Sequence, residues 1–438
     1  MLEHTHASKN IPFLIIRDQI LQGHWTLVDI QVPEDALLDD ADDDHHHHST
    51  SHRRYNVKAW FCDIDWNLHR DNPSSVSFFS GLKEQSKSCP STLQQVDLFD
   101  LMQKVRAHDD DDGGNSSSNN NNSNKMRSIP LTGIVFHQSR CGSTLAANLL
   151  ASFDPHKTRV YSEPSVTVKA IKACEAANDD TNYKNTCNHD LHNQLIRDVH
   201  YLLGRTAVDS GLEYIFIKSN SGGLYIDKFT SALPDTPWIY MFRDTFQVMQ
   251  SHWKIPEGEK QPSSVKCARQ YRNPIQPSTT LQVLETAAGG DKNNKRQYHE
   301  LSRTEYCAAH LASISNAVLQ EHQRTGKGTF VDYKQMPAVM WETVLPETFG
   351  VAVEPYMVDN MMQHTHLYSK GHQQGRENEP WASDTEQKES RISQSIKEAV
   401  QTFCPDTYDK LAKIALAQQQ QSVHAQALAL FASTTKAS

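Results

Sequence analysis

Short hydrophobic runs alternate along the chain with longer segments whose hydrophobic residues recur at helical spacing. The runs Ile134–Phe136, Tyr214–Ile217 and Trp238–Phe242 are short and bounded by polar residues, as buried strands are. Thr144–Leu150 and residues 190–208 instead place apolar residues about every 3.6 positions, which is typical of a helix. This alternation predicts an α/β fold with a central parallel sheet.

Residues 1–106 follow a different pattern. Trp25–Val32 and Val57–Trp66 have strand-like alternation, and Leu98–Val105 has the spacing of a short amphipathic helix. They predict a smaller N-terminal mixed α+β module. An Asp/His-rich insert, Leu38–His48, is too simple in composition to fold, so we expect it to be disordered; metal binding by its histidines is the less favoured interpretation.

Residues 107–127 contain an aspartate run followed by a Ser/Asn tract. Such a composition cannot bury a core, so we expect a disordered, low-complexity linker. The chain is thereby divided into an accessory module over 1–106 and a second domain over 128–438.

The composition argues against several classes of function. The 438-residue chain has a formal net charge of −9, which disfavours nucleic-acid binding by phosphate neutralisation. No apolar run approaches the ~18 residues of a membrane-spanning helix. The N-terminus lacks the basic and apolar regions of a signal peptide, so we expect a cytoplasmic protein. The eight cysteines are scattered, which predicts reduced thiols and neither a disulfide framework nor a zinc site.

The most informative segment joins the run Ile134–Phe136 to the helix that begins near Thr144. A strand, a tight loop and a helix direct several backbone N–H groups and the positive end of a helix dipole at one point, where they favour a phosphate-like anion. Arg140 adds a positive charge, and the hydroxyls of Ser143 and Thr144 add donors. The segment therefore predicts an anion-binding loop, with an ordinary strand-to-helix turn as the alternative.

This loop differs from that of nucleoside triphosphatases. Their pattern has a glycine five residues before Gly-Lys-[Ser/Thr]. Here His137 takes the glycine position and Ser143 takes the lysine position. Because that lysine reaches the β- and γ-phosphates, the loop is poorly suited to γ-phosphoryl transfer.

The loop resembles the 5′-phosphosulfate-binding loop of the sulfotransferases, whose usual form is Pro-Lys/Arg-Ser-Gly-Ser/Thr-Thr. The matching residues are Ser139, Arg140, Cys141, Gly142, Ser143 and Thr144. They depart from that form in having serine for proline and cysteine for the middle serine. The resemblance implies a P-loop-like three-layer fold in which these residues bind 3′-phosphoadenosine 5′-phosphosulfate (PAPS) as co-substrate, with no metal required.

Polar residues follow four predicted strands, of which Arg159–Tyr161 is the fourth. These residues are His137, Glu163, Lys218 and Arg243. Because an open α/β sheet binds its ligand beyond the carboxyl ends of its strands, we expect all four to line one crevice.

Arg243 is followed eight residues later by Ser251, inside the next predicted helix. A guanidinium at a strand end and a hydroxyl on the following helix can hold one phosphate from two sides. Sulfotransferases use such a pair for the 3′-phosphate of the donor, and the resemblance assigns that role to these two residues. The alternative is a salt-bridged arginine and a surface serine.

Two weaker similarities lie downstream. Gly328–Tyr333 resembles a late strand of the family, and Tyr368–Arg376 resembles its basic loop that closes over the 3′-phosphate. The resemblance makes Lys370, Gly371 and Arg376 further donor-binding candidates.

The resemblance extends over about 130–415 and ends in a predicted helical tail, Asp384–Lys413. The insert Glu257–Lys295 has no family pattern, and either covers the acceptor or is disordered.

The resemblance also implies roles in sulfuryl transfer to a hydroxyl or amine. Arg140 would hold the 5′-phosphate and stabilise charge on the bridging oxygen, and Lys218 would contact the sulfuryl group. Where many members have a histidine base, this chain has Asn220, which cannot accept a proton. Glu163, with a pKa raised by burial, is the preferred general base, and His137 is the reserve.

The sequence thus favours a PAPS-dependent sulfotransferase that acts on a small-molecule or carbohydrate acceptor. Two alternatives stay open: a P-loop small-molecule kinase and a non-catalytic nucleotide-binding relative. The acceptor, the role of the N-terminal module and the oligomeric state are not determined by the sequence.

Overall fold

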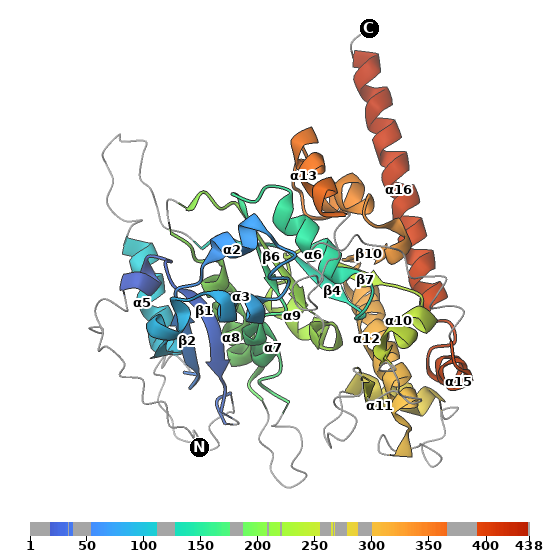
Figure 1. Ribbon diagram of the computed structural model, residues 1–438, viewed down its shortest axis with the longest axis horizontal. Helices are drawn as coiled ribbons and strands as arrows, with labels where there is room; N and C mark the ends of the chain where they lie inside the picture. The colour runs from blue at the N-terminus through green and yellow to red at the C-terminus, as the bar shows by residue number, and fades with distance from the viewer. Residues whose placement is uncertain are drawn as a thin grey trace, which may run out of the picture.

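A five-stranded parallel sheet lies at the centre of the computed structural model, in strand order β10-β7-β4-β6-β5 (Figure 1). The strands are β4 (Leu131–His137), β5 (Thr158–Ser162), β6 (Tyr214–Ser219), β7 (Trp238–Phe242) and β10 (Thr329–Asp332). The structure describes residues 18–33, 35–37, 54–111, 128–175, 187–207, 210–219, 221–254, 264–265, 267, 278–287, 300–365 and 392–436. The predicted α/β fold with a central parallel sheet is confirmed.

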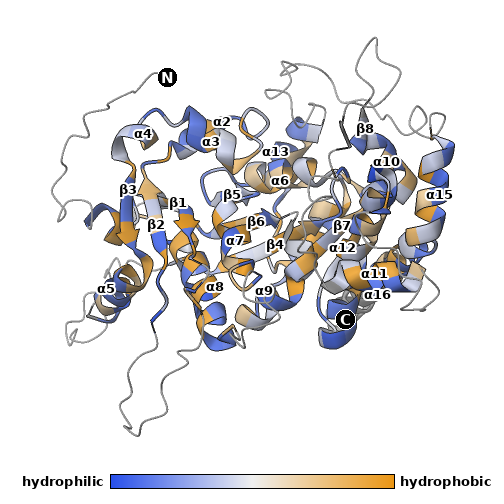
Figure 2. Ribbon diagram, turned by 90° about the horizontal axis from the view of Figure 1, so that it is seen from below, coloured by the Kyte–Doolittle hydropathy of each residue, from blue (hydrophilic) through white to orange (hydrophobic). Residues whose placement is uncertain are grey.

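Helices cover both faces of this sheet, because its strands carry apolar side chains on both sides. Phe136 and Tyr240 pack against one helical layer, whereas their neighbours Val135 and Met241 pack against the other. The first layer contains α7 (Ser165–Ile171), α8 (His189–Gly204), α9 (Ile226–Ala232) and α12 (Arg303–Thr325), and the second contains α6 (Ser143–Ser152), the π-helix Met340–Thr348 and α13 (Pro355–Thr365). Figure 2 shows hydrophobic residues along the central strands and hydrophilic residues on the outer helices. The three-layer arrangement is also as predicted.

The N-terminal module is built on an antiparallel sheet of three strands, β1 (Thr26–Gln31), β2 (Lys58–Cys62) and β3 (Gln94–Asp97). Its helices are α2 (Trp66–Asp71), α3 (Phe79–Gln85), α4 (Cys89–Thr92) and α5 (Leu98–Asp111). The mixed α+β character of the module is therefore confirmed. Its buried residues, such as Leu27 and Phe61, belong to the same hydrophobic cluster as Leu195 and Val199 of α8. The module thus packs directly on the first helical layer.

Two polar networks also join the module to α8. The hydroxyl of Tyr55 donates to Asp198 Oδ2 over 2.6 Å, and Arg106 pairs with the same carboxylate. Arg205 donates to both oxygens of Asp109 at 2.8–3.0 Å. Since Arg106 and Asp109 lie on α5, this helix includes the first residues of the predicted linker.

The C-terminal helices form a separate packing unit around α12. Val248 of α10 (Thr245–His252), Leu284 of α11 (Ser278–Ala287) and Val400 of α15 (Gln394–Phe403) share one buried cluster with α12. The last helix, α16 (Thr407–Lys436), lies beside β10 and then extends beyond the rest of the molecule (Figure 1). The predicted helical tail is therefore present as α15 and α16. Part of the insert between 257 and 295 folds as α11. Strand β9 (Ser264–Val265) also lies in this insert and pairs antiparallel with β8 (Trp253–Lys254), which precedes it.

The prediction of reduced thiols is wrong for six of the eight cysteines. Disulfides join Cys62 to Cys89, Cys174 to Cys187 and Cys267 to Cys307. The partners are 27, 13 and 40 positions apart, and only the folded chain brings their Cα atoms within 4.8–5.7 Å. Disulfides persist mainly in oxidising compartments, so the cysteines no longer support the expected cytoplasmic location.

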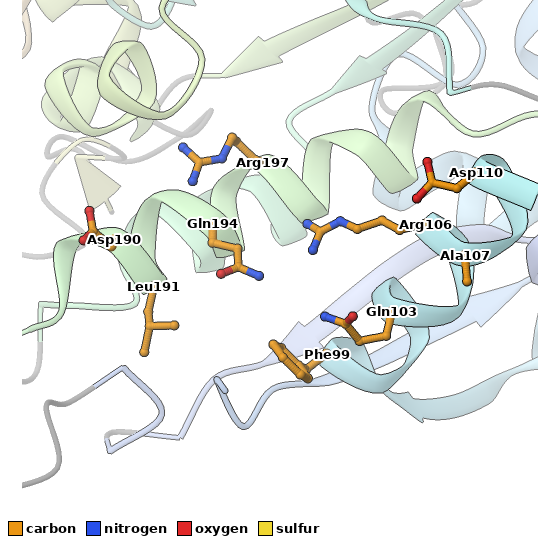
Figure 3. A pocket seen from close by; sticks show the side chains of 9 residues that line it. All are labelled: Phe99, Gln103, Arg106, Ala107, Asp110, Asp190, Leu191, Gln194 and Arg197. Carbon is orange, nitrogen blue, oxygen red and sulfur yellow. The ribbon is translucent and has the colours of Figure 1, made fainter. Parts of the chain in front are cut away.

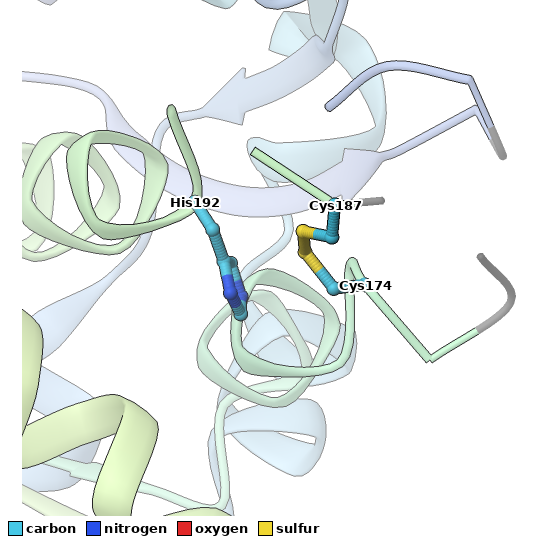
Figure 4. Close-up of side chains that lie close together, drawn as sticks. All are labelled: Cys174, Cys187 and His192. Carbon is cyan, nitrogen blue, oxygen red and sulfur yellow. A yellow bond between two sulfur atoms is a disulfide. The ribbon is translucent and has the colours of Figure 1, made fainter. Parts of the chain in front are cut away.

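One of these disulfides lies beside a histidine (Figure 4). The ligand-type atoms of Cys174, Cys187 and His192 are all within 4.8 Å of one another. Because the two sulfur atoms are bonded to each other, they are not thiolates and cannot ligate a metal as thiolates do. His192 Nε2 lies 2.9 Å from the carbonyl oxygen of Ala170, which orients the ring.

Within the described part of the chain, no helix combines the length and the apolar character needed to cross a bilayer.

Candidate active site

The strand order brings the four predicted strand-end residues to one edge of the sheet. Ser162 pairs in register with Lys218, so Glu163 and Lys218 lie on neighbouring strand ends. β4 lies between β6 and β7, so His137 at its end lies between the ends of those two strands, one position beyond the Phe136–Ser219 pair and opposite Met241. Glu163, Lys218, His137 and Arg243 therefore follow one another along the carboxyl edge.

The loop after β4 has a strained backbone. Ser139 and Arg140 both adopt left-handed conformations, with φ of 71° and 52°, although neither is glycine. Each costs ~1–2 kcal/mol relative to a right-handed residue, and such strain collects at functional sites. Gln138 N donates to Met241 O at 3.0 Å, and the Cys141 thiol lies 3.2 Å from the same oxygen. β7 thus holds the loop in this conformation.

The charge of the loop is positive. Arg140 is partly buried, and no carboxylate among the described residues pairs with it. Burial raises the pKa of the Cys141 thiol to about 11, so the thiol stays neutral at physiological pH. Ser143 and Thr144, the first two residues of α6, are buried with their backbones at the helix N-terminus. A cation beside a helix N-terminus can bind an anion such as a phosphate.

Tyr333, which follows β10, connects this loop to Arg243. A Cβ atom on Gly142 would lie 2.6 Å from the Tyr333 ring, and the Arg243 guanidinium stacks 4.3 Å from the centroid of the same ring. Arg243 is buried, and its Nε donates to Gln247 Oε1 at 2.6 Å. Its backbone N–H donates to Gln138 Oε1 at 3.4 Å. The loop, at Gly142, and the Arg243 guanidinium therefore both contact the Tyr333 ring, so the two lie close together.

Other predicted donor-binding residues are less well placed or fall outside the described residues. Ser251 is partly buried in the last turn of α10, and the structure records no bond between its hydroxyl and Arg243. Lys370, Gly371 and Arg376 lie outside the described residues.

A cluster of three ionisable groups occupies the β5–β6–β4 end of the edge. The Lys218 side chain is 1% exposed, and its Nζ lies 2.9 Å from Glu163 Oε1 and 3.2 Å from Ser162 Oγ. His137 Nε2 lies 3.6 Å from the same Oε1. Glu163 itself has a left-handed φ of 56° and is 35% exposed. The ion-pair distance to each of these two residues is measured to Oε1, and the 35% of the side chain that is exposed can meet a second molecule.

The pKa of Glu163 is lowered, contrary to the sequence-based expectation. Burial alone raises the pKa of this carboxyl, but the charge of Lys218 and the His137 ring lower it by more. The carboxylate is therefore ionised, as a base must be, but is a weaker base than one raised by burial. His137 Nδ1 accepts a hydrogen bond from Ser139 N at 3.1 Å, so a neutral ring carries its proton on Nε2, toward Glu163.

One residue of this site was missed from the sequence. The ring of Phe78, from the N-terminal module, lies 4.5 Å from Lys218 Nζ. Its surroundings, Ser74-Ser75-Val76-Ser77, carry no pattern that marks a functional residue. Only a contact between distant parts of the chain could have revealed it.

A separate cavity of about 650 Å³ lies between α5 and the first half of α8 (Figure 3). Its lining includes Phe99, Arg106, Leu191 and Arg197. None of the residues lining it belongs to the carboxyl edge of the sheet, so it is distinct from the candidate active site.

No protein-family model and no curated protein matches this chain. Solved structures of low similarity include the sulfotransferase STF1 from Mycobacterium tuberculosis H37Rv, which is 11% identical with a TM-score of 0.33 and covers 63% of this chain and 77% of its own. The sulfotransferase STF9 from Mycobacterium avium is 12% identical with a TM-score of 0.32, over 70% and 82% of the two chains. The sulfotransferase domain of the Synechococcus PCC 7002 olefin synthase is 13% identical with a TM-score of 0.31, over 66% and 98%. At such values these similarities carry no argument about chemistry, which has to come from the site itself.

Proposed function

We propose that this protein is a sulfotransferase that moves a sulfuryl group from PAPS to a hydroxyl or amine of an acceptor. The observation that carries the proposal is that the 139–144 loop and Arg243 both lie against the Tyr333 ring and are therefore close together. Two cationic sites a short distance apart suit a molecule with a phosphate at each end. The loop also lacks the lysine that a γ-phosphoryl-transfer loop uses.

The proposed roles follow the order of residues along the edge. Arg140 and the backbone at the start of α6 hold the 5′-phosphate, and Arg243 holds the 3′-phosphate. Gln247 and Tyr333 fix the Arg243 guanidinium, so little side-chain entropy is lost when it binds an anion.

Lys218 and Glu163 carry the chemical step in this proposal. The donor supplies the sulfuryl group, and the charge on its oxygens is stabilised by Lys218. The acceptor oxygen forms a bond to sulfur, its proton passes to the Glu163 carboxylate, and adenosine 3′,5′-bisphosphate leaves with the electron pair of the broken sulfur–oxygen bond. The Lys218–Glu163 ion pair keeps the carboxylate deprotonated before the acceptor arrives.

Ligand binding by thermal shift tests the donor site. Adenosine 3′,5′-bisphosphate is expected to raise the melting temperature, and ATP with Mg²⁺ is not. Arg140→Ala and Arg243→Ala are each expected to weaken bisphosphate binding at least 30-fold, because a lost charge-assisted contact is worth about 2 kcal/mol or more. Arg197→Ala, which removes an exposed arginine from the α5–α8 cavity, is the matched control and should bind normally. Stabilisation by ATP–Mg²⁺ alone would favour the kinase.

Glu163→Gln separates an enzyme from a binding protein. With labelled PAPS and a panel of acceptors, this variant is expected to lose about 100-fold or more in kcat and to retain bisphosphate binding. Full activity of the variant would show that Glu163 is not the base, and bisphosphate binding by the wild type without turnover of any acceptor would support the non-catalytic relative.

A further inference from the structure

The turn between α2 and α3, residues 72–78, brings the N-terminal module to the candidate active site. Its Phe78 ring centroid is 4.5 Å from Lys218 Nζ. Four residues earlier, the buried Ser74 Oγ accepts a hydrogen bond from Asn148 Nδ2 of α6 at 3.2 Å. Since α6 begins at the anion-binding loop, the turn is attached to the same helix that presents that loop.

Aromatic packing fixes the other side of this turn against β5. The Tyr161 ring of β5 lies 5.3 Å from the Phe79 ring, at the start of α3, and 5.0 Å from the Trp66 ring, measured between ring centroids. The Arg159 guanidinium covers Trp66 at 4.2 Å. Contacts to α6 and to β5 thus hold Phe78 from both sides, so its place beside Lys218 is a consequence of packing.

The position of Phe78 identifies the acceptor side of the site, given the proposed function on which this inference rests. In that function the donor extends from Arg243, which follows β7, to the loop after β4. Its sulfuryl group then points away from Arg243, toward the strand ends of β6 and β5. Lys218 and Glu163 lie on those two ends, and Phe78 lies over Lys218. An acceptor hydroxyl bound beside Glu163 and Lys218 is therefore close to the Phe78 ring.

The apolar side chain that the turn offers this acceptor is Phe78. The hydroxyls of the turn are engaged within the protein, because Ser77 Oγ donates to Ser74 O at 2.9 Å and Ser75 Oγ donates to Asn72 O at 2.8 Å. Phe78 is partly exposed, whereas Val76 is buried. A flat apolar ring stacks favourably on such a side chain, whereas the hydroxyls of a sugar would lose water without gaining a hydrogen bond from the Phe78 ring.

We propose that Phe78 is a specificity-determining residue, through which the N-terminal module selects acceptors whose hydroxyl is carried on a flat apolar ring, such as phenols and naphthols. The module is thereby part of the active site.

Calorimetric titration of the full-length protein with 2-naphthol, with and without saturating adenosine 3′,5′-bisphosphate, tests this proposal. Wild type is expected to bind 2-naphthol in a saturable manner and glucose not at all. Phe78→Ala should weaken naphthol binding at least tenfold, and Phe78→Leu, which keeps the bulk but not the flat ring, at least fivefold. Phe78→Tyr should stay within threefold of wild type. Trp60→Ala, which removes a partly buried ring from β2, controls for a general loosening of the module.

The two proposals fail in different titrations. Wild type that does not bind 2-naphthol, or Phe78→Leu that binds it as wild type does, overturns the acceptor proposal. Wild type that does not bind the bisphosphate overturns the proposed function, and the naphthol titration without bisphosphate still decides the role of Phe78. A Phe78→Leu variant that loses bisphosphate affinity equally would show a structural role only and would also overturn the proposal.

Discussion

Backbone strain and buried charge meet at single residues of the carboxyl edge. Ser139, Arg140 and Glu163 all have left-handed backbones without being glycine, and Lys218 is 1% exposed beside a carboxylate. Each feature opposes folding unless the surroundings compensate for it. Here β7 holds the loop, and the ion pair with Glu163 offsets the burial of Lys218. The strained backbones and the buried charge thus occur at the positions to which we assign the chemistry.

Gly142 is the glycine on which the conformation of the 139–144 loop depends. It has a left-handed φ of 85°, and a Cβ atom there would meet the Tyr333 ring at 2.6 Å. Gly142→Ala should therefore displace Tyr333, and with it the stacked Arg243. We expect a loss of about 2–3 kcal/mol in the free energy of unfolding and at least tenfold weaker bisphosphate binding, measured by urea unfolding and titration.

Gly211 provides the matched control for that substitution. Its φ of 68° is also left-handed, but no atom lies within 4 Å of the place that a Cβ atom would take. Gly211→Ala should lose only the ~1 kcal/mol due to backbone strain and should bind the bisphosphate normally. Equal effects of the two substitutions would mean that the Tyr333 contact is unimportant.

At the scale of elements, α5 and α8 hold the N-terminal module on the sheet domain. Arg205 of this contact is 2% exposed, and its guanidinium is paired with Asp109. Burial raises the pKa of Asp109, but the bonds from Arg205 and Tyr201 lower it by more, so the pKa is below its ordinary value. The carboxylate is therefore ionised throughout the physiological range.

Asp109→Ala should cost about 3 kcal/mol of unfolding free energy, because it leaves Arg205 buried without its carboxylate. The neighbouring Asp110 is exposed, and Asp110→Ala should cost less than ~0.5 kcal/mol. A carboxyl with a lowered pKa stabilises the fold above its unfolded pKa of about 4, and the stabilisation is lost as the pH falls through the folded value. The difference between wild type and Asp109→Ala, measured by urea unfolding, should therefore be constant from pH 8 to 5 and shrink below about pH 4. A difference that grows in acid would contradict this account.

At the scale of the whole molecule, three disulfides link different parts of the chain. The first lies within the N-terminal module, the second closes the connection from α7 to α8, and the third joins the 257–295 insert to α12. Two cysteines, Cys141 and Cys404, are free and buried. Alkylation of the denatured protein without reductant should therefore label these two positions, and alkylation after reduction should label all eight cysteines. Peptide mass mapping reads out both results. Labelling of all eight without reductant would restore the sequence-based prediction of reduced thiols.

The elements of the sheet domain could be predicted from local sequence, because each hydrophobic run already shows whether one or both of its sides are buried. β4, β6 and β7 contain the expected runs, and α6 and α8 follow the expected helical spacing. The strand, loop and helix around Ser139–Thr144 could also be predicted, since they depend on contiguous residues; anion binding by the loop stays a prediction.

Features that depend on contacts between distant parts of the chain could not be predicted from the sequence. The pKa of Glu163 was expected to be raised, but the residues that lower it, Lys218 and His137, come from two other strands. The cysteine pairs and the place of Phe78 beside Lys218 likewise depend on segments that meet only after folding.

The sequence by itself determined the α/β class, the strand ends that carry polar residues and the loop between β4 and α6, because these depend on hydrophobic period and on neighbouring residues. Tertiary structure alone decided which strand ends are adjacent, which charges are paired and that the N-terminal module reaches the site. The physical reason is that ion pairing, desolvation and ring stacking act over a few ångströms of space, whatever the separation along the chain.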